Sequence, residues 1–227
     1  MHAGQKLVRP DGSVAKRREL ISDLLLVKVS NQATVAFRDV FDVDGKPVRT
    51  REERLRTLFL GASRTAVEQA KAITKESGRY NIGVSRTLNS PLLPLHILVP
   101  RIASGFRFAR SAGTVTFDEF RSPTVVRHNT GSGMRDMLSR GWFVIDADSG
   151  RVLAASVTAG DASTEFQVAL DLRYGEDPAV KLLVPVEMKE RYWRPAKPRE
   201  DHLEVVSSYS KVRRFQVTTD EQVKVPK

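Results

Sequence analysis

The stretch RGWFVIDADSGRVLAASV (residues 140–157) poses the question on which the fold depends. Its two carboxylates, Asp146 and Asp148, lie between apolar segments and would suit a metal loop, a catalytic dyad or a tight turn. A calcium loop of this type needs an oxygen ligand at its fifth position and a glutamate at its twelfth. Those positions hold Gly150 and Val157. The stretch is therefore predicted to be a β-hairpin, in which Asp146 bonds to the turn backbone and Gly150 takes a positive φ.

The segments that follow Gly105 show the alternation of apolar and polar residues that is typical of half-buried strands. We expect one long antiparallel meander, with an edge or a bulge at Pro185 because proline cannot donate to the ladder. The last strand, within residues 205–219, is predicted to bulge near residues 211–213. The residues predicted to line one concave face are Phe106, Phe108, Val115, Phe117, Phe143, Ile145, Phe166, Val168, Leu170, Val184, Val186 and Met188.

The first half of the chain begins with two strands. Residues 18–29, RELISDLLLVKV, are apolar on both strand faces and are predicted to be buried on both sides. Residues 33–48 form a second strand that ends in a turn at Asp44 and Gly45, a dipeptide that accepts positive φ.

Three helices are predicted next. Residues 50–60 have a capping box and an apolar stripe of helical period. Residues 62–78 form a second amphipathic helix, for which Gly78 can supply a left-handed C-cap.

The third helix, residues 91–99, is apolar on every side. Ser90 can cap it, Pro91 suits its first position, and Pro100 ends it. A helix without a polar face must be enclosed, so we expect it to dock on the concave sheet as a plug that moves when a ligand enters, with Leu95 at the contact.

These elements predict one α+β domain spanning residues 1–227, with strands in 18–48, a helical insert in 50–100 and a meander in 105–220. The expected architecture is an unclosed antiparallel β-barrel, or half-barrel, curled around two or three helices.

Composition and motifs argue against most chemistry. The chain has 227 residues, a formal net charge of +10 and no cysteine, and its four histidines lie far apart. The positive charge favours anionic partners, but the basic residues are scattered among acidic ones, as on an ordinary solvated surface. No P-loop or nucleophile-elbow pattern occurs. We therefore expect no enzyme activity, no cofactor, no metal and no specific nucleic-acid partner.

Four segments resemble the bacterial outer-membrane lipoprotein carrier and sorting factors of the LolA, LolB and RseB-like superfamily: FRDVFDVDGKPVRTREERL (37–55), GWFVIDADSGRVL (141–153), LLVPVEMKERY (182–192) and YSKVRRFQV (209–217). The resemblance implies the half-barrel with an apolar cavity and a periplasmic location, although Met1 is followed by no recognisable signal peptide.

Together these features predict a non-catalytic carrier or sensor of a lipid, an acylated protein or another amphiphile, acting as a monomer, with envelope proteins as further partners. The alternative is an interaction scaffold of a bacterial envelope assembly with a closed core. The predicted ligand-binding residues are Leu95, Phe106, Phe108, Phe117, Phe143, Ile145, Phe166, Val168, Leu170, Val186 and Met188.

Overall fold

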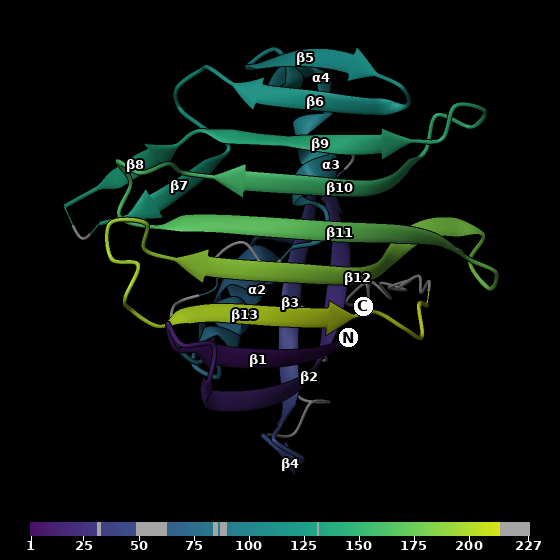
Figure 1. The fold of residues 1–227 in the computed structure, drawn as a ribbon. Helices are drawn as coiled ribbons and strands as arrows, with labels where there is room; N and C mark the ends of the chain where they lie inside the picture. Colours follow the sequence, from purple (N-terminus) through teal and green to yellow (C-terminus); the bar gives the residue numbers. More distant parts are fainter. Residues whose placement is uncertain (31–32, 49–62, 84–85, 87–89, 131, 214–227) are drawn as a thin grey trace, which may run out of the picture.

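The computed structural model describes residues 1–30, 33–48, 63–83, 86, 90–130 and 132–213. Within them an 11-stranded sheet has the order β4-β3-β2-β1-β13-β12-β11-β10-β9-β6-β5, and every pair of neighbouring strands is antiparallel (Figure 1). The two end strands, β4 and β5, do not pair with each other, so the sheet is unclosed. The expectation of a mainly antiparallel α+β domain with one large open sheet is confirmed.

The strands of this sheet are β1 (His2–Val8), β2 (Val14–Ser30), β3 (Ala33–Val43), β4 (Lys46–Pro47), β5 (Phe106–Ser111), β6 (Thr114–Glu119), β9 (Ser139–Ile145), β10 (Val152–Ala159), β11 (Gln167–Asp177), β12 (Leu182–Trp193) and β13 (His202–Ser208). A separate hairpin pairs β7 (Val126–Asn129) with β8 (Met134–Met137). The described helices are α2 (Ser63–Gly78), α3 (Leu93–Ile97) and α4 (Pro100–Ala103).

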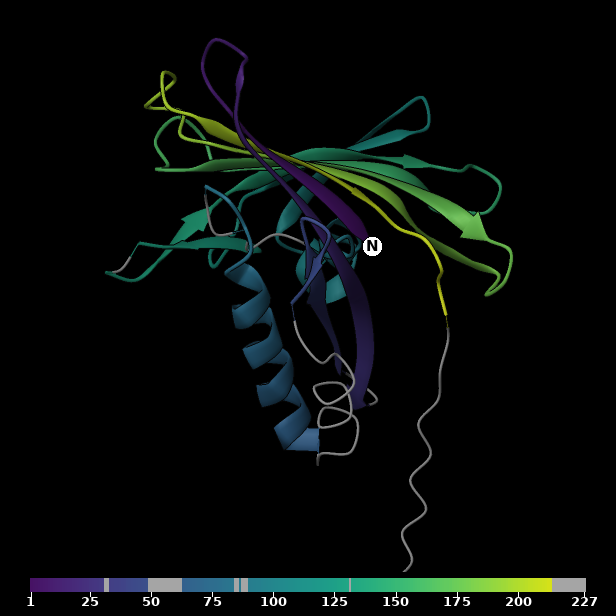
Figure 2. The ribbon, with the colours of Figure 1, turned by 90° about the horizontal axis from the view of Figure 1, so that it is seen from below.

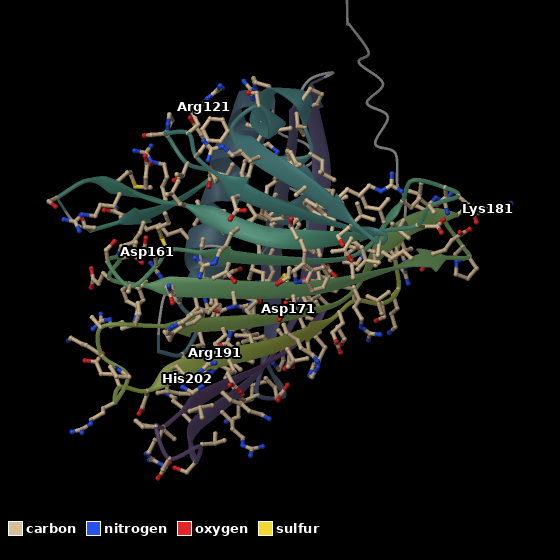
Figure 3. All side chains as sticks on the ribbon, turned by 45° about the horizontal axis from the view of Figure 1, so that its top comes forward. Arg121, Asp161, Asp171, Lys181, Arg191 and His202 are labelled. Atoms are coloured by element: carbon tan, nitrogen blue, oxygen red, sulfur yellow. The ribbon has the colours of Figure 1, made fainter. Side chains whose placement is uncertain are left out.

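All three helices lie on one side of the sheet, which we call the inner face (Figure 2). The strand β2 bends, so that its second half and β3 run behind the main body of the sheet on the helix side (Figures 1 and 2). The helix α2 packs against β3, and α3 contacts β10. Asp171 and Arg191 lie on the opposite, outer face (Figure 3).

Two strands near the chain ends differ from the prediction. The strand β1 was missed, although it joins the two parts of the chain by pairing with β2 on one edge and β13 on the other. Strand β13 covers residues 202–208, and residues 209–213 are not in a strand, so the bulge predicted at 211–213 is wrong. Lys211 has a φ of 57°, in the left-handed region, and residues 214–219 of the predicted strand lie outside the described residues.

The two predicted turns are confirmed. Asp44 and Gly45 have φ values of 53° and 78°, which suit the tight turn between β3 and β4. In the turn between β9 and β10, the Ser149 backbone N–H donates to the Asp146 carboxylate at 3.1 Å, and Gly150 has a φ of 67°. The Asp146 side chain therefore holds the turn by accepting a hydrogen bond from the turn backbone, as the sequence predicted.

The strand β2 and the helices need two corrections. Ile21 and Leu26 on β2 are exposed, so the strand is not buried on both sides as predicted. The helix at 62–78 is confirmed as α2, and Ile73 of its predicted stripe is buried. Gly78, however, belongs to the helix and does not have the positive φ of a left-handed cap. The predicted helix at 50–60 lies outside the described residues.

The third predicted helix is shorter than expected. Residues 91–99 hold only the single turn α3, with Pro94 in its first turn, and Pro100 begins α4 instead of ending a helix. The Ser90 hydroxyl accepts the Leu92 backbone N–H at 3.3 Å, but Pro91 precedes the helix. Three prolines within ten residues break the segment because each lacks a backbone donor.

A buried carboxylate fixes the small hairpin to the sheet. Glu119, at the end of β6, accepts the backbone N–H groups of Val125 at 2.7 Å and Ser139 at 2.9 Å. These bonds join the segment before β7 to the start of β9. Burial raises the pKa of Glu119, so both bonds help to retain its charged form.

Candidate functional site

The inner face of the sheet is polar at one end and apolar at the other. Strand pairing places seven residues in one cross-strand row: Gln5, Val205, Glu190, Leu170, Val157, Gly141 and Phe117. The next row consists of Ala3, Ser207, Met188, Leu172, Ala155, Phe143 and Val115. Polar residues gather on β1, β12 and β13, whereas β11, β10, β9 and β6 supply an apolar wall.

Most of the predicted lining residues belong to this face. The residues whose predicted burial is confirmed are Phe106, Phe117, Phe143, Val168, Leu170 and Met188. Val115, Ile145, Phe166, Val184 and Leu95 are only half-buried. Whether any of them binds a ligand stays a prediction.

Phe108 and Val186 are exposed and correct the predicted lining. Phe108 pairs with Phe117 and shares its face, but β5 is the last strand of the sheet and leaves the ring 41% exposed. Val186 lies at an irregularity of β12, where Arg173 pairs with Glu187 but Tyr174 pairs with Pro185. This is the irregularity predicted at Pro185; it shifts the alternation, so Val184 and Val186 no longer share the face of Met188.

An aromatic cluster forms the centre of the apolar wall. The ring centroids of Phe117 and Phe143 lie 4.9 Å apart, and Phe106 meets Phe117 edge-on at 5.7 Å. Gly141 makes room for this cluster, because a Cβ there would lie 2.8 Å from Cζ of Phe117 and 1.9 Å from the Ser156 carbonyl oxygen. Such contacts are too short for any side chain larger than hydrogen.

A short segment covers part of the wall. Ile97 of α3 is fully buried, and the Tyr174 hydroxyl of β11 donates to the Pro91 carbonyl oxygen at 2.7 Å. The predicted docking of this segment on the inner face is confirmed, but its complete enclosure is wrong. Leu98 and Val99 are 36% and 41% exposed, because the segment ends at the surface instead of continuing as one helix.

Phe166 belongs to a different place. It precedes β11 and lines an open surface depression of about 500 Å³, open solvent included, together with His128, Arg135, Asp136, Met137 and Ser163–Glu165. Its ring lies 5.1 Å from the His128 ring, and the Arg194 guanidinium sits 4.6 Å above it. Phe166 is therefore part of a polar surface and not of the apolar wall.

The polar end of the inner face is built on a buried ion pair. Arg86 donates from Nε to Glu190 Oε2 at 3.0 Å and from Nη2 to Glu190 Oε1, and both side chains are fully buried. The Tyr192 hydroxyl donates to Glu190 Oε2 at 2.7 Å. Burial by itself lowers the pKa of Arg86, but the neighbouring Glu190 carboxylate outweighs this effect and raises the pKa above its usual value. Burial and then Glu190 raise the pKa of Tyr192.

Asn81 connects this pair to a second arginine. Its side-chain oxygen accepts hydrogen bonds from Gln5 Nε2 at 2.9 Å, Arg38 Nη2 at 3.2 Å and Arg86 Nη1 at 3.5 Å. Arg38 is 2% exposed, and its Nε and Nη1 have no hydrogen-bond partner. Burial first, and the Arg86 charge second, lower the pKa of Arg38 to about 9.

These side chains form a polar cluster that was not predicted from the sequence. Its members are Gln5, Arg38, Asn81, Arg86, Glu190 and Tyr192. One of its members had a local signal. Glu190 lies two residues from both Met188 and Tyr192 and so shares their strand face. Arg86 had no such signal, since it meets Glu190 across 104 positions of sequence.

The described residues contain no group of three or more His, Asp or Glu side chains placed to hold a metal ion. Among them, no helix has the length and apolar character needed to cross a membrane. No family model, curated protein or solved structure was found to match the chain.

Proposed function

We propose that the protein is a non-catalytic binding protein, a carrier or a sensor, that takes up an amphiphilic ligand on the inner face of its open sheet. The observation that carries the proposal is the division of this face into an apolar wall and a polar cluster. The strands of Glu190 and Phe117 are four steps apart in the sheet, a span of roughly 19 Å at about 4.8 Å per strand. An elongated ligand with one polar end would match both parts.

The energetics favour such a ligand. Burial contributes about 0.8 kcal/mol for each methylene group, so an acyl chain gains affinity without any directed polar contact. In this proposal the sheet acts as a half-barrel, and residues 91–99 leave the wall when the chain enters. The segment suits this role because its prolines limit its own hydrogen bonding and α3 is only one turn long.

A second candidate is an interaction scaffold with a closed core, in which function lies on the surface. The burial of the aromatic cluster favours this candidate, since Phe117 and Phe143 are 1% and 0% exposed. A filled core needs no ligand to be stable. The two candidates differ in one measurable property, which is the uptake of an amphiphile by the intact protein.

The test is a titration with dodecanol below its solubility limit, followed by native mass spectrometry and by competition with a fluorescent amphiphile. We expect saturable uptake at one site. Phe117→Leu should weaken it, whereas Phe120→Leu, a matched change at a ring that is 48% exposed, should not. If the wild-type protein takes up no amphiphile, the carrier proposal fails and the scaffold is favoured.

The proposal extends to location and partners. A carrier of lipid or acylated protein would act in the bacterial periplasm as a monomer, beside other envelope proteins. Fractionation of cells that produce the tagged full-length protein would test the location. Recovery in the cytoplasmic fraction alone would contradict it.

A further inference from the structure

The polar cluster has more hydrogen-bond donors than acceptors. The Asn81 side-chain oxygen serves three donors, two of them guanidinium groups. Arg38 Nε, Arg38 Nη1 and Asn81 Nδ2 are buried without a partner. Buried polar groups are nearly always hydrogen-bonded, so donors left over in this number call for an acceptor that the described residues do not provide.

The charges of the cluster show the same excess. Arg38 and Arg86 carry two positive charges, and Glu190 carries one negative charge. Asp39 is not a member of the cluster, because adjacent residues of a strand point to opposite faces. Among the described residues, the cluster therefore holds one positive charge more than its negative charge, in a site screened from water, which is a costly arrangement.

We propose that this excess forms the head-group site for the proposed amphiphile, and that the head is a monoanionic carboxylate bound by Arg38 and Asn81. The inference rests on the proposed function, because the apolar wall would hold the tail. A single negative charge neutralises the cluster, and a carboxylate offers two acceptor oxygens to donors that now have none. A doubly charged phosphate would leave a negative charge in place of the positive one.

Two further observations support this assignment. The pKa of Arg38 is lowered to about 9, so its charged form is held at a cost that an adjacent anion would remove. Among the described residues, the Tyr209 hydroxyl donates to the thioether sulfur of Met188, at 3.9 Å. Thioether sulfur is a weak acceptor. The Arg38 charge acts on the pKa of the Tyr209 hydroxyl, so the two side chains are neighbours, and the neutral hydroxyl is a further donor for the same head group.

The site implies a conflict between stability and binding. Arg38→Met removes a buried cation that has no anionic partner among the described residues and replaces it with an unbranched apolar side chain. The ligand-free variant should therefore melt at a higher temperature than the wild type, while it loses its preference for the carboxylate. A residue with a purely structural role would give the opposite result, since its removal would lower the melting temperature.

The experiment compares dodecanoate with dodecanol, which share a tail and differ in the head. We expect the wild type to bind dodecanoate roughly tenfold or more tightly than dodecanol, as charged hydrogen bonds allow. In Arg38→Met and Arg38→Gln the two ligands should bind equally, with dodecanol unchanged. Arg173→Met, at an exposed arginine, is the control and should keep the preference.

The outcomes separate the two proposals. Equal binding of both ligands by the wild type would overturn the head-group site and leave the amphiphile proposal standing. If neither long-chain ligand binds but acetate raises the melting temperature of the wild type and not of Arg38→Met, the anion site stands and the amphiphile proposal falls. Stronger stabilisation by inorganic phosphate than by acetate would overturn the carboxylate assignment. No effect of any of these ligands would overturn both.

Discussion

Replacing Arg86 by methionine tests the buried ion pair most directly. The change would leave Glu190, which is 3% exposed, with the Tyr192 hydroxyl as its remaining donor among these groups. Two charged hydrogen bonds are lost, each worth about 1.5–3 kcal/mol. Breaking a buried pair by removing one partner costs about 3–5 kcal/mol in total. Since domains are stable by about 5–15 kcal/mol, the variant should lose a large share of its free energy of unfolding.

The assay is urea unfolding followed by circular dichroism, with the midpoint and slope fitted for each variant. Arg173→Met is the matched control, because Arg173 is largely exposed and lies 3.5 Å from Glu187, so the loss of this pair should cost less than about 1 kcal/mol. Arg86→Met combined with Glu190→Gln should recover part of the loss, since no charge is then stranded. A loss below about 1 kcal/mol for Arg86→Met alone would refute the reasoning.

Three further predictions follow from the same contacts. Gly141→Ala should lower the free energy of unfolding by about 1–3 kcal/mol or more, because its Cβ would lie 1.9 Å from the Ser156 carbonyl oxygen; an unchanged urea midpoint would contradict that contact. Burial lowers the pKa of Arg38 to about 9 in the folded protein. The buried charge therefore destabilises the fold fully below about pH 9, and this destabilisation decreases as the pH rises above that value. The melting-temperature gain of Arg38→Met over wild type should thus shrink between neutral pH and pH 10 or so, and a constant gain would argue against a charge effect. Leu95→Asp, at a half-buried position, should cost less than about 2 kcal/mol yet alter dodecanol uptake, and no change in either melt or uptake would exclude the plug role of residues 91–99.

The strands of the meander could be predicted because their signals are local. In β11, Val168, Leu170, Leu172 and Tyr174 are buried in strict alternation, as the sequence indicated. Asp146 and Gly150 encode their turn within five residues. The strand that was missed depends instead on distant partners. The strand β1 holds its place through β2 and β13, and a strand whose stability comes from such neighbours carries a weak local pattern.

The candidate site was predictable only on its apolar side. Phe117 and Phe143 follow from alternation alone, whereas the exposure of Phe108 follows from the position of β5 at the edge of the sheet, which no local pattern reveals. The face of Glu190 could have been read from Met188 and Tyr192. Its partner could not, because any of the 37 basic residues in the chain could have filled that place. Strand order therefore had to be known before the polar cluster could be found.

Arg38 and Arg86 make a comparison that separates structural from functional burial. Both guanidinium groups are almost completely buried and share the Asn81 oxygen, but within the described part of the chain Arg86 has a carboxylate partner and Arg38 has none. The Arg86–Glu190 pair is explained by the fold, since removing either partner would leave the other as an unpaired buried charge. The Arg38 cation lowers the free energy of unfolding, and methionine at this position would avoid that cost. An anion from outside the chain that completes the cluster would explain an arginine at this position. For this reason Arg86→Met is expected to lower the melting temperature of the ligand-free protein, and Arg38→Met is expected to raise it.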